Sequence, residues 1–293
     1  MEKRNTSPRV PRTILCATDL SCRCDRALDR AVSLARRWEA NLLLLTVIEP
    51  GDAAVARQRY TGASRRQVAE GVLRADANVK GVAVSVRVEE GTVAETIRRV
   101  AAADACDLIV TGIARNEAFG RMVLGTTVDT LVRRSTTPIL VVRSRVRGNY
   151  RRLTVPTDFL APSQYALETA LAYFPDRALS LFHAYSTSYL GMTGGDLTIE
   201  QARARADAER EAREFLDRCE LSPEVRKRLR LVLSFGSPSS ALNDYVDNGD
   251  SDLIVLATHG RSVLLDLLIG GEAKRILDTA TADVLVVRHA TGG

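Results

Sequence analysis

Asp107-Leu108-Ile109-Val110 and Asp252-Leu253-Ile254-Val255 are the same four residues in the same order, 145 positions apart. Leu140-Val141-Val142-Arg143 recurs at that offset as Leu285-Val286-Val287-Arg288. Short apolar runs of this kind are typical of buried strands, and both keep their spacing in the two halves of the chain. The sequence therefore predicts two copies of one structural unit.

The two copies differ in length. Thr18-Asp19 near the start of the first copy corresponds to Thr157-Asp158 in the second at an offset of 139, so the second copy has gained about six residues before the repeated apolar runs. The stretch 186–195 is rich in Gly, Ser and Thr. We expect the additional residues to lie there, because such a composition is typical of loops.

Each copy alternates apolar runs with helical patterns. The predicted strands lie at about 13–17, 41–48, 82–88, 107–112 and 138–143, and at about 152–156, 178–185, 229–234, 252–257 and 283–288. The helix after each first strand is expected to begin behind Ser21 or Ser163 as N-cap, and a longer amphipathic helix is expected over 198–219. Continuous apolar strands indicate a parallel sheet with helices on both faces, so each half is predicted to be a five-stranded, doubly wound α/β domain.

These patterns divide the 293 residues into a basic N-terminal tail (1–12), a first domain (13–145), an Arg-rich linker (146–151) and a second domain (152–293). Hydrophobic residues make up 45% and charged residues 26%, which favours a soluble globular protein. No apolar run approaches the roughly 18–20 residues that span a bilayer, and the N-terminus has no apolar signal region. We expect a cytoplasmic protein with no membrane partner.

The net charge of +5 does not predict nucleic-acid binding. Residues 1–12 hold four basic groups and one acid, and 143–152 hold five arginines and no acid, so the basicity lies in a tail and a solvated connector rather than on a continuous face. The five cysteines are an odd number and are interpreted as reduced. Cys22 and Cys24 lack a second pair of ligands, so no metal site is predicted from the protein alone.

Ligands of such sheets bind beyond the carboxyl ends of the strands, where the strand order reverses. Asp19 and Asp158 each follow the first strand of a copy. A carboxylate there either accepts hydrogen bonds from a ribose or a base amine, or caps the following helix. The residues alone leave both interpretations open.

A second candidate feature follows the fourth strand. In the first copy Gly112 ends the strand and Gly125-Thr126-Thr127 opens a helix, and in the second copy Ala257-Thr258-His259-Gly260 is followed by Gly270-Gly271. Glycines allow close backbone approach, and the free amides, hydroxyls and positive helix end suit a phosphate.

This pattern resembles the universal stress protein family, whose nucleotide-binding members carry Gly-x2-Gly-x9-Gly-Ser/Thr after strand four. The resemblance covers nearly the whole chain as a tandem pair and implies Rossmann-like domains of the adenine nucleotide alpha hydrolase type. It implies binding of ATP or another adenine nucleotide, with Mg²⁺ or Mn²⁺, and an intramolecular pseudo-dimer formed through the final strands. A homodimer and an unidentified protein partner are further expectations.

The resemblance assigns candidate nucleotide contacts in each copy. In the first they are Asp19, Val47, Gly112, Arg115, Gly125, Thr126 and Thr127. In the second, expected to be weaker, they are Pro156, Asp158, Ala184, Ala257, His259, Gly260, Gly270 and Gly271. Arg115 and Ala257 each replace an expected glycine, Gly271 replaces the Ser/Thr, and Glu272 adds a carboxylate beside the phosphate position.

Two functions remain open at this stage. The first is a stress-response sensor or regulator that binds an adenine nucleotide, with at most slow hydrolysis, because the sequence contains neither a Walker motif nor a Gly-x-Ser-x-Gly elbow and offers no identifiable general base or nucleophile. The alternative is an interaction scaffold whose altered loops have lost the ligand. No catalytic residue is assigned.

Overall fold

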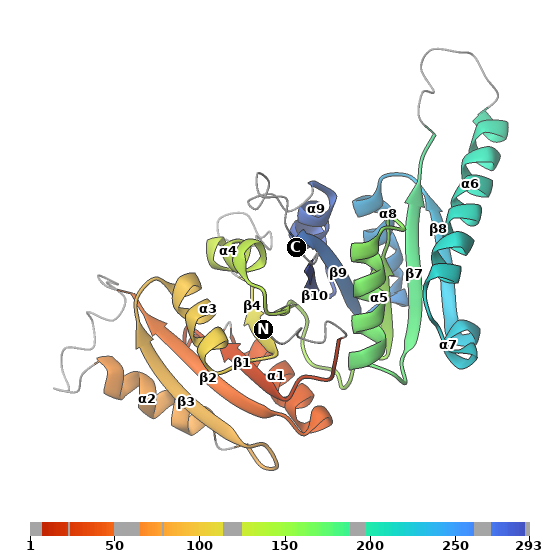
Figure 1. Ribbon diagram of the computed structural model, residues 1–293. Helices are drawn as coiled ribbons and strands as arrows, with labels where there is room; N and C mark the ends of the chain where they lie inside the picture. Colours follow the sequence, from red (N-terminus) through yellow and green to blue (C-terminus); the bar gives the residue numbers. More distant parts are fainter. Residues whose placement is uncertain are drawn as a thin grey trace. The chain divides into compact units, whose positions relative to one another are not determined.

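The computed structural model describes residues 8–22, 24–49, 65–77, 79–113, 125–187, 197–260 and 271–290 (Figure 1). The chain forms two compact units. One is made chiefly of Val10–Asn149 and the other chiefly of Tyr150–Val263 and Leu268–Gly293. Each unit carries one of the two sequence copies.

The first unit is a parallel sheet in the order β3-β2-β1-β4-β5. The strands are β1 (Thr13–Ala17), β2 (Asn41–Ile48), β3 (Val84–Glu90), β4 (Leu108–Gly112) and β5 (Ile139–Val142). The helices are α1 (Asp25–Trp38), α2 (Arg65–Asp76), α3 (Val93–Ala103) and α4 (Thr126–Arg134). The strand order reverses between β1 and β4, which is where a ligand crevice forms in this architecture.

The second unit repeats this arrangement in the order β8-β7-β6-β9-β10. Its strands are β6 (Arg152–Pro156), β7 (Ala178–Tyr185), β8 (Leu229–Phe235), β9 (Leu253–Gly260) and β10 (Asp283–Ala290). Its helices are α5 (Ala161–Tyr173), α6 (Leu197–Arg218), α7 (Pro223–Arg228), α8 (Pro238–Tyr245), the π-helical turn Val246–Asp250 and α9 (Gly271–Thr279). The predicted fold of two doubly wound α/β domains is confirmed.

The helix starts differ from the prediction. The N-cap of α1 is Cys24, not Ser21, because the chain first makes a turn in which Ser21 binds Asp19. Helix α5 has Leu160 as N-cap and already contains Ser163. Pro162 lies in its first turn, where the fixed φ of proline favours the helix and removes an amide that would have no intrahelical partner.

The stretch predicted to hold the extra residues of the second copy lies mostly outside the described residues. Within the described part of the chain, α6 has 22 residues against 12 in α2, and α7 has no counterpart in the first unit.

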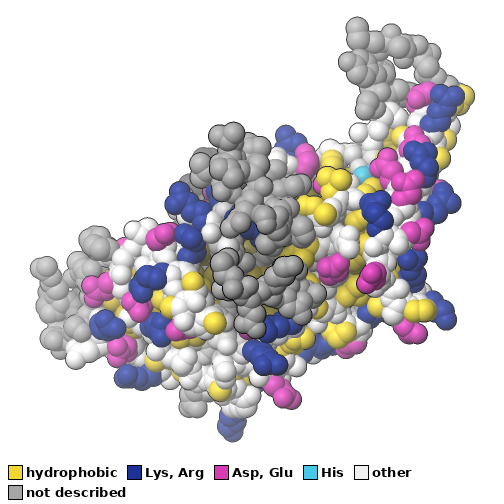
Figure 2. Space-filling view, in the orientation of Figure 1, with side chains coloured by type: hydrophobic (Ala, Val, Ile, Leu, Met, Phe, Trp, Pro, Cys, Tyr) yellow, Lys and Arg dark blue, Asp and Glu magenta, His cyan; other side chains and the backbone are white. Residues whose placement is uncertain are grey.

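Helix α6 packs through its C-terminal half and exposes most of its N-terminal half. Ala208, Ala212 and Phe215 are buried, whereas Ile199 is 52% exposed. Ion pairs link neighbouring turns of the exposed surface: Arg203–Glu200, Arg205–Glu209 and Arg210–Asp207. Figure 2 shows basic and acidic side chains interspersed over this helix, the pattern expected for a solvated amphipathic helix.

The connector between the domains is bound to the first domain through its backbone. Arg26 donates from Nη1 to the carbonyl of Arg143 at 2.9 Å, and the buried Arg30 donates to the carbonyl of Gly148 at 2.9 Å. Within the second domain, the buried Tyr150 hydroxyl donates to Asp283 at 2.6 Å. The expectation of a solvated connector therefore holds for exposed side chains such as Arg145 but not for these carbonyls.

Gly91 and Gly236 directly follow the equivalent strands β3 and β8 and have positive φ angles of 141° and 132°. Their amides donate to the carbonyls of Ile48 and Tyr185, which close the neighbouring strands. A Cβ atom on Gly91 would lie 2.9 Å from Oγ1 of Thr96, whereas one on Gly236 would meet nothing within 4 Å.

This difference yields a matched pair of substitutions. Gly91→Ala and Gly236→Ala each introduce backbone strain, on the order of 1–3 kcal/mol, and Gly91→Ala adds a steric contact. We expect urea unfolding to show both variants destabilised, with the larger loss for Gly91→Ala. Equal or reversed losses would contradict the role of Thr96.

Candidate functional site

The turn after β1 is held by two side chains of its own. Thr18 Oγ1 accepts from the amide of Leu20 at 3.0 Å, and Asp19 Oδ1 accepts from the amide and hydroxyl of Ser21 at 2.9 and 2.6 Å. Leu20 adopts a left-handed φ of 62°, which is uncommon for a residue other than glycine. We call this arrangement the Thr-Asp turn.

The turn after β6 is built in the same way. Thr157 Oγ1 accepts from the amide of Phe159 at 2.8 Å, and Asp158 Oδ1 accepts from the amide of Leu160 at 3.1 Å. Phe159 has the same φ of 62°, and the Ser163 hydroxyl donates to Asp158 at 2.7 Å. The two aspartates build turns rather than cap helices, because the N-caps are Cys24 and Leu160.

Asp19 also accepts a hydrogen bond from the thiol of Cys24 at 3.1 Å. Partial burial would by itself raise the pKa of Asp19, but the hydrogen bonds from Ser21 and Cys24 outweigh it and lower this pKa below its usual value. Burial raises the pKa of the Cys24 thiol to about 11. At neutral pH the pair is therefore a carboxylate with a protonated thiol donor.

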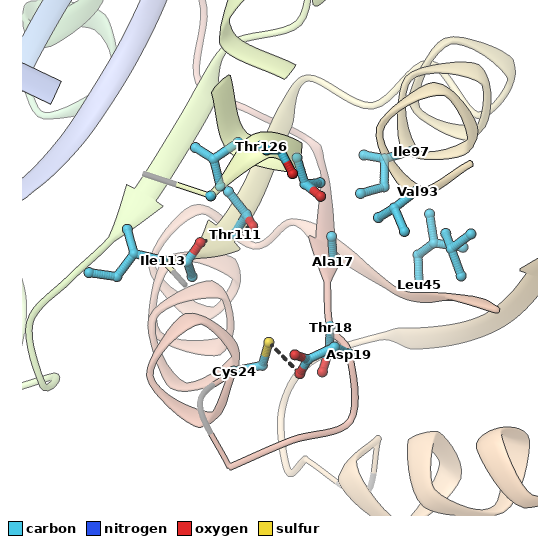
Figure 3. Close-up of a pocket in the computed structure, with 15 residues that line it drawn as sticks. Ala17, Thr18, Asp19, Cys24, Leu45, Val93, Ile97, Thr111, Ile113 and Thr126 are labelled. Carbon is cyan, nitrogen blue, oxygen red and sulfur yellow. Dashed lines mark hydrogen bonds between the residues drawn. The ribbon is translucent and has the colours of Figure 1, made fainter. Parts of the chain in front are cut away.

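A cavity of about 280 Å³ opens beside this turn, at the carboxyl ends of β1, β2 and β4. Figure 3 shows Asp19 and Cys24 on one side of it, with Thr111 and Thr126 across from them. The predicted residues that line it are Asp19, Val47, Gly112, Gly125, Thr126 and Thr127. The structure thus brings together six of the seven candidates of the first copy, and Arg115 lies outside the described residues.

The walls of this first pocket differ in chemistry. Leu45, Val93 and Ile97 form an apolar side (Figure 3). Helix α4 begins on the opposite side with Thr126. Its N-cap residue, Gly125, has an extended backbone and provides no side-chain hydrogen bond to the first amides of the helix. The first amides of a helix have no intrahelical partner and carry the positive end of the helix dipole, so this wall offers hydrogen-bond donors to an anion.

The second domain has a pocket of about 420 Å³ in the equivalent place. The predicted residues that line it are Pro156, Asp158, Ala184, Ala257 and Gly271. His259 and Gly260 belong to the end of β9, and the His259 side chain lies outside the described part of the structure. Gly270 lies outside the described residues.

His183 is a pocket residue that the sequence did not predict. His183 lines the second pocket, and its Nδ1 lies 2.8 Å from the carbonyl oxygen of Thr157. In the first domain the hydroxyl of Thr46 donates to the corresponding carbonyl, that of Thr18, at 2.6 Å. Aligning β2 with β7 pairs Thr46 with His183, and this substitution of a hydroxyl by an imidazole is the signal that would have identified it.

The comparison with known families agrees with this duplicated geometry. The model of the universal stress protein family matches residues 11–143 and again residues 149–288. The chain belongs to the universal stress protein family. The predicted family and its tandem organisation are confirmed.

Solved structures share the fold of this universal stress protein over almost its whole length. A universal stress protein from Archaeoglobus fulgidus DSM 4304 is 16% identical, with a TM-score of 0.67 over 94% of this chain and 98% of that chain. A functionally unknown protein from Pseudomonas aeruginosa PAO1 is 20% identical, with a TM-score of 0.66 over 95% and 92%. No curated protein matches the chain. None of the described helices is long and apolar enough to cross a membrane.

The lowered pKa of Asp19 gives a pH-dependent prediction. Asp19→Asn keeps the shape of the turn but removes the charge. A carboxyl whose pKa is lowered by folding contributes stability above its unfolded pKa, and this contribution disappears as the pH falls through the folded pKa. We expect urea unfolding to show Asp19→Asn less stable than wild type at pH 7, with a difference that shrinks in acid. A difference that grows in acid would contradict the assignment.

The raised pKa of Cys24 gives a second prediction. Only the thiolate reacts with iodoacetamide, so Cys24 should react slowly at pH 8, whereas Cys22 is exposed. Mass spectrometry of the peptide containing both residues should show Cys22 modified first. Faster modification of Cys24 would contradict the hydrogen-bonded thiol.

Proposed function

We propose that the first domain binds ATP or a related adenine nucleotide, and that the protein acts as a stress-response sensor or regulator with at most slow hydrolysis. The observation that carries the proposal is the first pocket, which places Asp19 opposite the start of α4. Six residues chosen from the sequence as nucleotide contacts line this one cavity.

The chemistry of the walls fits the parts of a nucleotide. The Asp19 carboxylate accepts hydrogen bonds, as ribose hydroxyls or a base amine require. Leu45, Val93 and Ile97 offer apolar surface to a base. The Thr126 and Thr127 hydroxyls and the amides of the first turn of α4 offer donors to phosphate oxygens, supported by the helix dipole.

A divalent cation fits this site only as a partner of the phosphates. Among the described residues no group of three His, Cys, Asp or Glu side chains is arranged to hold a metal. Mg²⁺ commonly uses one or two protein ligands together with phosphates and water, and the Thr126 and Thr127 hydroxyls are the protein oxygens at the phosphate end. When bound, the ion would neutralise phosphate charge.

The acid–base groups of the pocket support slow hydrolysis at most. Among the described residues, the ionisable side chains that line it are Asp19 and Cys24. The lowered pKa of Asp19 makes it a weak base, and the raised pKa of Cys24 keeps it protonated. The proposal is therefore a binding function rather than a catalytic one.

Isothermal titration with ATP and Mg²⁺ tests the proposal. We expect wild type to bind, and Asp19→Asn and Thr126→Val each to weaken binding about tenfold, because each removes a hydrogen bond to the ligand. Asp207→Asn, on the exposed surface of α6, is the matched control and should bind as wild type does. Absence of binding by wild type, or weakening by Asp158→Asn but not by Asp19→Asn, would overturn the assignment.

The scaffold alternative is favoured by one observation in the second domain. Glu272 lies in the first turn of α9, where its carboxylate competes with a phosphate for the positive helix end. A protein that binds nucleotide in neither domain would show no thermal shift with ATP and Mg²⁺.

Four further expectations stay predictions. They are pairing of the two domains, a homodimer, a further protein partner and a cytoplasmic location.

A further inference from the structure

The second pocket is larger and its walls are mainly apolar. It is a cavity of about 420 Å³ at the carboxyl ends of β6, β7 and β9. Its apolar lining includes Pro156, Phe182, Pro238, Leu256 and Ile276. Walls of this kind bind the apolar or aromatic body of a small molecule, while a few polar groups determine its orientation.

The charged side chains that line this pocket are both acidic. Asp158 stands at the end of β6, and Glu272 stands in the first turn of α9. Within the described part of the chain, no lysine or arginine lines the cavity. A negatively charged ligand would therefore meet two carboxylates and no cationic side chain from the described lining.

Arg275 pairs with the carboxylate of Glu272, whose Oε1 accepts from it at 2.7 Å, and among the described residues no group donates to the buried Oε2. The side chain as a whole is 41% exposed and lines the pocket. Its negative charge therefore favours a cationic ligand over an anionic one.

His183 supplies a further acceptor. The carbonyl of Thr157 can only accept, so the hydrogen bond between it and Nδ1 requires the proton on Nδ1. In the neutral ring Nε2 then carries a lone pair. The ring is held against Phe159, with centroids 4.3 Å apart, so the imidazole is fixed in this orientation.

The equivalent position in the first domain has the opposite chemistry. Glu272 corresponds to Thr127, and Gly271 corresponds to Thr126, at the start of α9 and α4. Two hydroxyls that can donate to an anion are thus replaced by a glycine and a carboxylate. Glu272 is itself the anion at the positive end of α9.

We propose that the second pocket binds a small organic cation, an ammonium group on an apolar or aromatic body, and excludes ligands that carry phosphate. The charges of Asp158 and Glu272 attract the ammonium, and the apolar body lies against the proline and aliphatic walls. The two domains then bind ligands of opposite charge. This inference does not depend on nucleotide binding by the first domain.

Three probes of similar size and different charge test the inference on the full chain. They are the cation 2-phenylethylamine, the neutral alcohol 2-phenylethanol and the anion 3-phenylpropionate, measured at pH 7 by ligand-observed NMR titration. We expect the cation to bind about tenfold more tightly than the anion, with the alcohol between them.

Two substitutions assign the binding to this pocket. Glu272→Gln keeps the shape of the side chain and removes its charge, and Asp158→Asn does the same at the other carboxylate. Each substitution should weaken the binding of 2-phenylethylamine about tenfold. Asp19→Asn in the first domain and Asp207→Asn on α6 are matched controls that should leave it unchanged. Circular dichroism shows whether each variant is folded.

The outcomes separate this inference from the proposal for the first domain. Equal or tighter binding of 3-phenylpropionate, absence of binding by the amine, or weakening by Asp19→Asn rather than Glu272→Gln would each overturn the cation assignment. ATP binding that is lost on Asp158→Asn would overturn the exclusion of phosphate. The proposal for the first domain fails separately, if wild type shows no binding of ATP and Mg²⁺.

Discussion

The Thr-Asp turn is the constraint on which both pockets depend. In each domain a threonine hydroxyl and an aspartate carboxylate accept hydrogen bonds from backbone amides, and the residue after the aspartate is held in a left-handed conformation. Because these bonds satisfy amides that the end of a strand leaves unpaired, the turn can leave the sheet abruptly and still have its polar groups paired. It presents an aspartate at the point where the strand order reverses, and it sets where the next helix begins.

Two different pockets have formed around this common turn. The carbonyl of the turn threonine is bound by Thr46 in one domain and by His183 in the other, so the backbone requirement is met by different side chains. At the opposite wall, Gly125-Thr126-Thr127 corresponds to a helix start with Gly271-Glu272. The backbone of the turn must form its hydrogen bonds in both domains, whereas the side chains that line the pockets are not held to this requirement. The pocket lining can therefore differ between the domains while the fold stays the same.

The sequence predicted the strands more accurately than the helix starts. Buried strands are continuous apolar runs, and their signal does not depend on partners elsewhere in the chain. The starts behind Ser21 and Ser163 were wrong because both serines bind the preceding aspartate instead of a helix amide. The role of His183 was missed for a similar reason: its partner is a carbonyl in the turn after the neighbouring strand β6, 26 positions away in sequence.

The sequence by itself determined the duplication, the parallel α/β architecture, the family and six of the residues that line the first pocket, because each of these follows from local patterns repeated along the chain. Only the tertiary structure decided what those residues do. It showed that Asp19 and Asp158 build turns, that Cys24 donates to Asp19, and that no described group donates to the buried Oε2 of Glu272. Hydrogen bonding and burial depend on which atoms meet in space, and residues far apart in sequence supply those atoms.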